Sequence, residues 1–387
     1  MLKHIDNFEG YVLPGTALSS PAYLGTVYNL WSASSMSITS LASTPENRVT
    51  LYRGGTAAAA VTLPLQNHWP EEGAIYFGAR MVNFPNTANS NSNVGQFGLA
   101  RVQSGAFSGV LVKIGFVNRN TLSVSWVDSG IVVEQLTTLV QPIFGNSDYV
   151  EFKLVRGEAG QLGQLAIWLN NRLVFDELCI PGNVLTEELH WIALGNLAGR
   201  VAGSTGSYVQ IGLTLSTVSI PFGVTDFYVV NEEPGLNTGR LGRIRVTGRA
   251  PSGDVGPNDW VPYSGATEED HADILAVTPP QSGKYVSAAA EAQTEMYGGA
   301  AFPALGGEQV VGMMTRILAS KVDPEGPDLK AVVKSGTTEE AGDPAVLGGT
   351  LSYINTVFEL NPATSSRWTA AEANNSRFGF TSESAVP

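Results

Sequence analysis

The densest set of side chains with metal-ligand chemistry consists of Glu268, Glu269, Asp270, His271 and Asp273. Carboxylate oxygens are the ligands that Ca²⁺ prefers, whereas a histidine nitrogen suits Zn²⁺. The spacing lacks the ligand ladder of an EF-hand, and no second histidine lies nearby. Acidic runs of this kind are usually solvated surface segments. We therefore expect an acidic loop without a bound metal, and cation binding by this loop is the open alternative.

A second polar group brings Asp254 close in sequence to Asn258 and Asp259. These oxygens could chelate a cation, but Asp and Asn side chains more often bond to nearby backbone in Asx turns. We expect turns here, and we predict no metal site and no cofactor for the chain.

The residue patterns that catalyse bond breaking are missing from the sequence. Glycoside hydrolysis uses two carboxylates around one bond, whereas Glu151 and Asp176 each stand alone on a predicted strand. Serine hydrolysis needs a nucleophile, a base and an orienting acid, and the chain has no Gly-x-Ser-x-Gly elbow. His190 lies beside Trp191 in an apolar strand, which favours a structural histidine. We predict no catalytic residue and no enzyme; an enzyme acting on cell-wall polysaccharide is the disfavoured alternative.

Cys179 is the one cysteine of the chain and lies in the apolar stretch of residues 174–180. A lone cysteine forms no internal disulfide. It is expected to be a small core side chain rather than a nucleophile. Stability must then come from packing, to which oligomerisation can add.

Tryptophans divide into strand and loop positions. An aromatic side chain buries about 150–250 Å², so those on predicted strands are expected in the core: Trp126, Trp168 and Trp191. Aromatic rings in loops are better placed to stack on a sugar or to contact a partner. The predicted ligand-binding residues are therefore the loop aromatics Trp31, Trp69, Trp260 and Tyr263. The Asn-rich segment 83–93 is expected to be a surface loop, with recognition as its alternative role.

Charge and hydropathy exclude two classes of partner. The net charge is -13, and affinity for nucleic acid depends on Lys and Arg contacts to phosphates. No stretch approaches the ~20 apolar residues of a membrane span, and the N-terminus lacks the basic and apolar regions of a signal peptide. We expect a soluble protein that binds no nucleic acid, does not insert into membranes and is not exported by a cleaved signal.

Short alternating runs dominate the chain and predict β-strands. Residues 121–127 alternate apolar and polar side chains, so one face is buried and the other is wet. Residues 149–155 alternate in the same way. Two further apolar runs, 165–169 and 172–176, flank Asn170-Asn171, a pair that tolerates the positive φ of a tight turn. The pattern predicts a strand meander.

Few segments have helical character. The Ala-rich residues 287–293 and the residues 368–375 are each long enough for a short helix. In the second, Thr369 and Glu372 have the spacing of a capping box. The fold class is therefore all-β.

The chain of 387 residues is too long for one ordinary core, which indicates two domains. Glu, Pro, Gly and Asn interrupt the strand pattern at residues 231–239. We place the boundary there, with domains at 1–232 and 233–387. The clearest predicted strands of the second domain are 242–248, 309–321, 329–335, 350–359 and 376–382.

The first domain resembles a known sandwich family. Residues 167–175 read Ile-Trp-Leu-Asn-Asn-Arg-Leu-Val-Phe. This meander resembles the concanavalin A-like, laminin-G-type jelly roll, in which an apolar-Trp-Leu-Asn strand turns into a Leu-Val strand. The opening residues 5–10, the strand 74–82 and the closing residues 224–229 fit the same pattern. The resemblance implies an N-terminal jelly-roll β-sandwich followed by a second, smaller β-domain.

The junction and the second domain resemble a recurrent structural protein of tailed-phage virions. The matching blocks are residues 225–231, 241–246 and 251–254, followed by Asp259-Trp260. Further matches are His271, Pro279-Pro280, residues 284–286, Met296-Tyr297, residues 357–362, residues 368–372 and residues 378–380. Arg243 stands where the family often has Asp, so no site built on that carboxylate is assumed.

This resemblance implies a structural component of the virion (tail, collar, baseplate or capsid-attached decoration). We expect a homo-oligomer that contacts other virion proteins and copies of itself and is assembled in the host cytoplasm. Apolar strand edges in the second domain are expected to supply the contact area. The alternative is a lectin-like module of the particle that binds host surface glycan.

Overall fold

The computed structural model describes residues 1–6, 29–31, 36–40, 49–53, 60–65, 68–69, 73–82, 94–103, 106–128, 131–141, 148–158, 161–180, 188–195, 201–202, 208–209, 222–263, 266, 270–277, 283–302 and 309–384, some of them by backbone alone. These residues form strands with two short helices, so the predicted all-β class is confirmed. Neither described helix has the length and apolar character that a membrane span requires.

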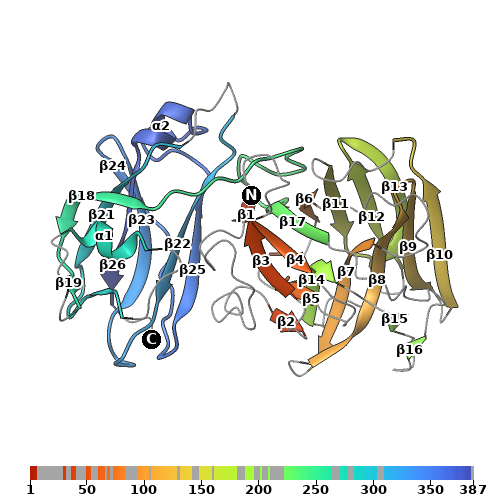
Figure 1. Cartoon of the computed structure of the whole chain (residues 1–387), viewed down its shortest axis with the longest axis horizontal. Helices are drawn as coiled ribbons and strands as arrows, with labels where there is room; N and C mark the ends of the chain where they lie inside the picture. The colour runs from red at the N-terminus through yellow and green to blue at the C-terminus, as the bar shows by residue number, and fades with distance from the viewer. Residues whose placement is uncertain are drawn as a thin grey trace.

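The first part of the chain is a sandwich of two antiparallel sheets (Figure 1). One sheet has the order β13-β12-β11-β6-β17-β4-β3, and β1 pairs with β17. Its strands are β1 (Leu2–Asp6), β3 (Met36–Ser40), β4 (Val49–Arg53), β6 (Ala74–Val82), β11 (Tyr149–Val155), β12 (Gly163–Leu169), β13 (Arg172–Ile180) and β17 (Phe222–Asn231).

The facing sheet has the order β10-β9-β8-β7-β14-β5-β2, and β15 joins it through a pairing with β8. Its strands are β2 (Asn29–Trp31), β5 (Ala60–Pro64), β7 (Val94–Gln103), β8 (Ala106–Asn118), β9 (Thr121–Asp128), β10 (Ile131–Thr138), β14 (Glu188–Gly195), β15 (Val201–Ala202) and β16 (Tyr208–Val209). The described strands of this sheet end at β10 on one side.

The predicted meander is confirmed. Strands β11 and β12 pair antiparallel, and β12 pairs with β13 from Leu169 opposite Arg172. Asn170 and Asn171 form the turn with φ of 50° and 67°. Positive φ at both central residues suits the right-handed twist of the strands on either side.

One large apolar core fills the space between the two sheets. Phe97 of β7 and Phe152 of β11 meet across it, with ring centroids 5.0 Å apart. Cys179 is fully buried in this core, as predicted, and burial raises the pKa of its thiol. Trp126 is also buried there and packs edge-on against Phe175.

Trp168 was predicted to lie in the core, and this prediction is wrong. It is half-buried on the other face of its sheet, and the Arg240 guanidinium lies 4.6 Å from its ring centre. Alternation along β12 places Ile167 inward and Trp168 outward. The side chain of Trp191 lies outside the described residues.

The second part of the chain builds a sheet in the order β18-β21-β26-β23-β24 and two ribbons, β19-β20 and β22-β25. The strands are β18 (Pro251–Asn258), β19 (Val261–Pro262), β20 (Val286–Ser287), β21 (Thr294–Gly299), β22 (Met313–Ala319), β23 (Asp328–Ser335), β24 (Thr338–Ala341), β25 (Ser352–Phe358) and β26 (Arg377–Glu383), with helices α1 (His271–Leu275) and α2 (Ala370–Asn375). None of these strands pairs with a described strand of the sandwich.

Two local predictions for this part have different outcomes. Helix α2 begins with the predicted capping box, in which Thr369 and Glu372 bond each other's backbone. The predicted helix over 287–293 is wrong, because that stretch leaves β20 and turns. Ala292 has φ of 58°, which ends any helix, and the Gln293 side chain accepts hydrogen bonds from the backbone of Ala289 and Ala290.

The predicted strand over residues 242–248 is also wrong. This segment is irregular and lies over the outer face of the first sheet, where Ile244 packs with Leu2 and Tyr228. Its backbone bonds to side chains of the sheet instead of a neighbouring strand, since Gly242 N donates to Glu151 and Val246 N donates to Asp226.

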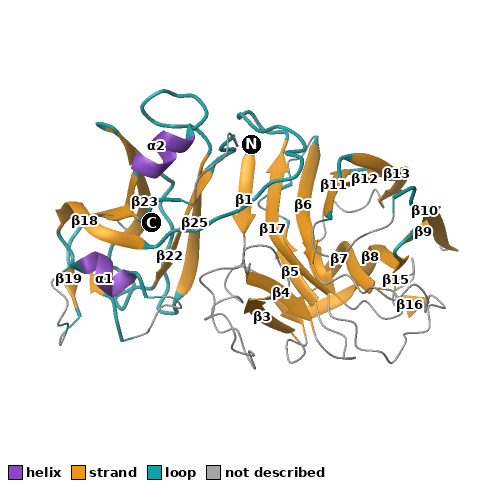
Figure 2. Ribbon diagram, turned by 45° about the horizontal axis from the view of Figure 1, so that its top comes forward, coloured by secondary structure: helices purple, strands orange, loops and turns teal. Residues whose placement is uncertain are grey.

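Strand β1 lies between the two parts of the chain (Figure 2). It pairs with β17 on one side and contacts β25 on the other. Glu359, just after β25, accepts hydrogen bonds from the backbone N–H groups of Leu2, Leu236 and Asn237. One carboxylate therefore ties the first strand, the connecting segment and the second domain together.

Candidate functional site

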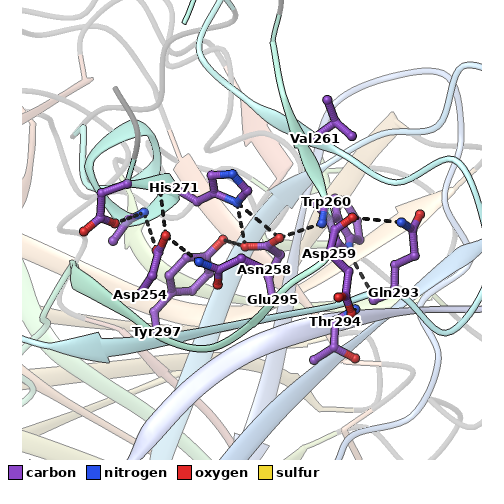
Figure 3. A network of polar contacts seen from close by, with 12 residues as sticks. Asp254, Asn258, Asp259, Trp260, Val261, His271, Gln293, Thr294, Glu295 and Tyr297 are labelled. Carbon is purple, nitrogen blue, oxygen red and sulfur yellow. Dashed lines mark hydrogen bonds and ion pairs between the residues drawn. The ribbon is translucent and has the colours of Figure 1, made fainter. Parts of the chain in front are cut away.

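Glu295 on β21 is the centre of a buried polar network in the second domain (Figure 3). Its carboxylate accepts hydrogen bonds from the backbone N of Trp260 at 2.7 Å and from the hydroxyl of Tyr297 at 2.7 Å. Nδ1 of His271 lies 3.1 Å from Oε2 and 3.2 Å from Oε1 of the same carboxylate. Three groups therefore contact one buried carboxylate: a backbone N–H after β18, a hydroxyl of β21 itself and a ring nitrogen of α1. These contacts satisfy a polar group that would be costly to bury without partners.

The neighbouring carboxylate of Asp254 positions helix α1. It accepts hydrogen bonds from the backbone N of His271 at 3.0 Å and of Ala272 at 2.9 Å, and from the Asn258 amide at 2.6 Å. Asp270 caps the same helix by accepting from Ala272 N at 2.8 Å. Burial raises the pKa of Asp254, and the nearby Asp270 raises it further.

Asp259 and Gln293 close the network around the Trp260 side chain. Asp259 accepts from the backbone N of Thr294 at 2.9 Å, and the Gln293 amide donates to the Asp259 carbonyl at 2.8 Å. The indole N–H of Trp260 donates to the Gln293 carbonyl at 3.0 Å. Asp259 was expected to stabilise a local turn. Its side chain instead bonds to β21 and links that strand to the segment after β18.

A histidine paired with a carboxylate has the elements of a general base. The hydrogen bonds of Glu295, however, are made by groups that hold β18, β21 and α1 together. The Tyr297 hydroxyl donates to this carboxylate, and burial together with this hydrogen bond raises the pKa of Tyr297 well above its usual value. Among the described residues no set of three His, Cys, Asp or Glu side chains is arranged to hold a metal ion.

The acidic cluster predicted as a solvated loop is placed differently in part. His271 is buried and begins α1, whereas Asp273 is exposed on the same helix and Asp270 is its N-cap. Glu268 and Glu269 lie outside the described residues. Sequence reasoning missed the pairing of His271 with Glu295 because 24 residues separate them. The residues that carried the motif resemblance include His271 and Met296-Tyr297 but not Glu295, so they gave no signal for this pairing.

A second buried network lies on the outer face of the first sheet. Glu151 accepts from the Tyr228 hydroxyl at 2.5 Å, from Arg240 at 2.6 Å and from Gly242 N at 2.9 Å. Arg240 is thus the ionic partner of Glu151 although it lies 89 residues away in the chain, and none of these three partners is a second carboxylate. Asp176 also has a partner, the Gln164 amide at 2.5 Å.

Asp226 on β17 makes a similar set of contacts, with one arginine and one backbone N–H. It is fully buried, accepts from Arg80 Nε at 2.6 Å and from Val246 N at 2.9 Å, and has φ of 51°. Its carbonyl accepts from the Tyr149 hydroxyl at 2.9 Å. Together the two carboxylates fasten the segment after the boundary onto the sandwich.

The predicted ligand-binding aromatics do not form one site. Trp69 is 4% exposed and packs in the large core with Arg156 over its ring, so it cannot present a face to a ligand. Trp260 is half-buried and packs edge-on against Phe380 at 4.8 Å. Tyr263 pairs with Tyr285 beside the β19-β20 ribbon, with ring centroids 5.9 Å apart. The Trp31 side chain and the segment 83–93 lie outside the described residues.

Several solved structures are similar to this chain at low sequence identity. An endo-beta-1,4-glucuronan lyase from the fungus Trichoderma reesei is 13% identical over 59% of this chain and 95% of its own, with a TM-score of 0.36. Alginate lyase Aly36B is 14% identical over 61% and 98%, with a TM-score of 0.35. Galectin LEC-6 of Caenorhabditis elegans is 12% identical over 46% and 96%, with a TM-score of 0.25.

No protein-family model matches the chain, and no curated protein matches its sequence. These solved structures are jelly-roll β-sandwiches. At identities of 12–14% and TM-scores of 0.25–0.36, the likeness carries no argument about this chain.

Proposed function

We propose that this chain is a non-enzymatic structural component of a tailed-phage virion that assembles as a homo-oligomer. The observation that carries the proposal is what the motif residues do. The Asp and Tyr of the 225–231 block, Asp226 and Tyr228, bind the backbone of the 241–246 block through Val246 and Leu241.

The later motif residues behave in the same way. His271 and Tyr297 bond to Glu295, Trp260 packs on Phe380, and Asp254 holds the start of α1. These residues are used to fasten strands to one another. A motif that specifies a rigid joint and a rigid second domain fits a part that is copied many times in a particle.

The proposal is tested on purified particles. Peptides of this chain should be found by mass spectrometry in gradient-purified particles, and gold-labelled antibody should decorate one position on them. The same chain present in the lysate but absent from the particles would refute a virion role. Host proteins of similar abundance serve as the control for contamination.

The non-enzymatic part has its own test, because polysaccharide lyases share the sandwich at low similarity. Incubation with uronic-acid polysaccharides should release no new chain ends above a heat-denatured sample. Turnover by the purified chain that is lost in a His271→Ala variant would overturn it and make the Glu295 network an active site.

Glycan binding by the particle is the second candidate. Val261 and Tyr285 are 59% and 49% exposed, and the Tyr263–Tyr285 pair offers sugar a face at the end of the second domain. Retention of the full chain on a glycan array, lost on Tyr285→Ala and kept with Val346→Ala, is the result that this candidate requires.

A further inference from the structure

Four exposed aliphatic side chains lie on the two edge strands at one end of the sandwich. Strands β10 and β13 end their sheets on that side, farthest from the second domain (Figures 1 and 2). Ile131 and Leu136 of β10 are 69% and 61% exposed, and Leu173 and Leu178 of β13 are 48% and 62% exposed. Within the described part of the chain, β10 pairs with β9 alone, and no described strand pairs with its other edge.

The edges of the second-domain sheet are protected by contrast. All four residues of the edge strand β24 are exposed, and two of them are Glu339 and Glu340. At the opposite edge, β18 contains Pro251 and Pro257 and pairs irregularly with β21. Charges, prolines and irregular pairing are the devices that prevent edge strands from pairing with another chain.

Strand β10 has few of these devices, and it pairs regularly with β9. Its sequence, Ile-Val-Val-Glu-Gln-Leu-Thr-Thr, has one charged residue and neither proline nor glycine. That residue, Glu134, bonds back to the hydroxyl of Ser123 on β9 at 2.7 Å. The contact area between copies was expected on apolar strand edges of the second domain. The exposed apolar edge is instead found on β10 of the sandwich.

We propose that β10 pairs antiparallel with β10 of a second copy, so that the two sandwiches share one continuous sheet. This inference rests on the proposed function in taking the partner to be another copy of the chain. Directly opposite residues of an antiparallel pair point to the same face of the sheet. A two-fold axis perpendicular to the sheet keeps every residue on its own face, so opposite residues must be an even number of positions apart in sequence. The axis therefore passes through a residue position.

Two central registers keep most of β10 paired, and charge decides between them. An axis at Glu134 would set two like-charged carboxylates directly opposite, which is destabilising. An axis at Gln135 sets Gln135 opposite itself and Glu134 opposite Leu136, and it pairs residues 132–138. The proposed register is the one centred on Gln135.

The exposed area is sufficient to contribute to such a dimer. Burying one aliphatic side chain is worth about 1.5–3 kcal/mol, and each Å² of apolar area contributes ~25 cal/mol. One such side chain therefore corresponds to about 60–120 Å² of area removed from water. The exposed side chains of β10 and β13, with Val140 at 71% beyond β10, correspond to about 200–350 Å² per copy. Backbone and polar groups of two edge strands make up the rest of the ~800 Å² of a standard interface.

The first experiment measures mass in solution by light scattering over a dilution series. The native chain should have twice the 40.9 kDa of one chain. Leu136→Glu places a second carboxylate directly opposite Glu134 of the partner copy and should weaken dimerisation at least tenfold, whereas Val346→Glu, at a similarly exposed site of the second domain, should leave it unchanged. A monomeric native chain, or a Leu136→Glu variant as dimeric as Val346→Glu, overturns the proposal.

The second experiment tests the register with cysteine variants. Opposite residues in an antiparallel pair have Cα atoms about 4.5–5.5 Å apart, within reach of a disulfide, so Gln135→Cys should give an oxidised dimer. Val133→Cys keeps Glu134 in place; in this register Val133 lies opposite Thr137, four residues (roughly 13 Å) along the strand from Val133 of the partner copy, so it should cross-link no more than a collision control. Thr338→Cys on the exposed β24 measures random collision, and Cys179 is buried. Cross-linking of Val133→Cys equal to that of Gln135→Cys would place the axis at Glu134 and overturns the register.

These experiments distinguish a failure of the β10 pairing from a failure of the virion proposal. A β10 dimer that never enters particles refutes the virion role alone. A particle protein whose mass and cross-linking do not respond to β10 variants refutes the edge pairing alone.

Discussion

Arg316 of β22 forms a 3.0 Å ion pair with the fully buried carboxylate of Asp6 on β1. The first strand of the sandwich therefore bonds to the second domain across the joint between them. Arg316 also donates to the Asn355 side chain of β25, which keeps the guanidinium in place.

Replacing Arg316 with Met should lower the free energy of unfolding by about 3 kcal/mol. Removing one partner of a buried ion pair leaves the other charge uncompensated, which costs about 3–5 kcal/mol. The expected cost lies at the lower end of this range because the Asp6 carboxylate keeps a second polar neighbour, His4 Nε2 at 3.6 Å. Urea denaturation measures it. Lys330→Met, which breaks the more exposed pair with Glu383, should cost less than about 1 kcal/mol; equal losses would contradict a structural joint.

Gly379 is expected to tolerate no side chain. A Cβ atom there would lie 1.8 Å from the carbonyl oxygen of Glu295, a backbone atom of the paired strand β21. Gly379→Ala should therefore destabilise the chain by about 3 kcal/mol or more, since backbone must shift. Gly348→Ala, where nothing lies within 4 Å, should change stability by less than about 0.5 kcal/mol. Thermal unfolding of the two variants side by side gives the comparison.

Stability should fall as the pH drops from about 6.5 to about 4. Burial, together with the nearby His4 and Lys3, lowers the pKa of His68 from 6.5 to about 4. Between these values the unfolded chain binds a proton that the folded chain does not, so acid favours unfolding. The loss is at most about 3 kcal/mol, because His68 keeps some exposure.

Denaturation curves of the native chain and His68→Gln at pH 4, 5, 6 and 7 provide the measurement. The variant should show a flatter dependence on pH over this window. An unchanged slope would show that other groups control acid sensitivity.

Cys179 should resist thiol reagents in the folded chain. The thiol is fully buried, and burial raises its pKa, so the reactive thiolate is scarce. Labelling with a disulfide reagent should be complete in denaturant and slow in buffer. Thr338→Cys, on the exposed β24, should add one site that reacts at once. Fast labelling of the native chain would mean that the core opens locally.

Local features of the fold were predictable from the sequence because each depends on neighbouring residues. The Asn170-Asn171 turn follows from the tolerance of Asn for positive φ. The capping box of Thr369 and Glu372 follows from their spacing. Where a local pattern failed, as at 242–248 and 287–293, side chains such as Asp226 and Gln293 took the backbone N–H groups instead.

The site residues were harder to predict because their partners are distant in the chain. Glu151 reads as an isolated strand carboxylate until Arg240 and Gly242 lie against it. His271 reads as part of an acidic loop until Glu295 lies beside it.

The sequence by itself determined the strand class, the alternation that places Cys179 and Trp126 in a core, and the turn chemistry between strands. Only the tertiary structure decided that Trp168 faces Arg240, that Trp69 is buried and that β10 is left as an unprotected edge. Residue periodicity sets which side chains share a face of a strand. Which element covers that face depends on contacts between segments far apart in the chain.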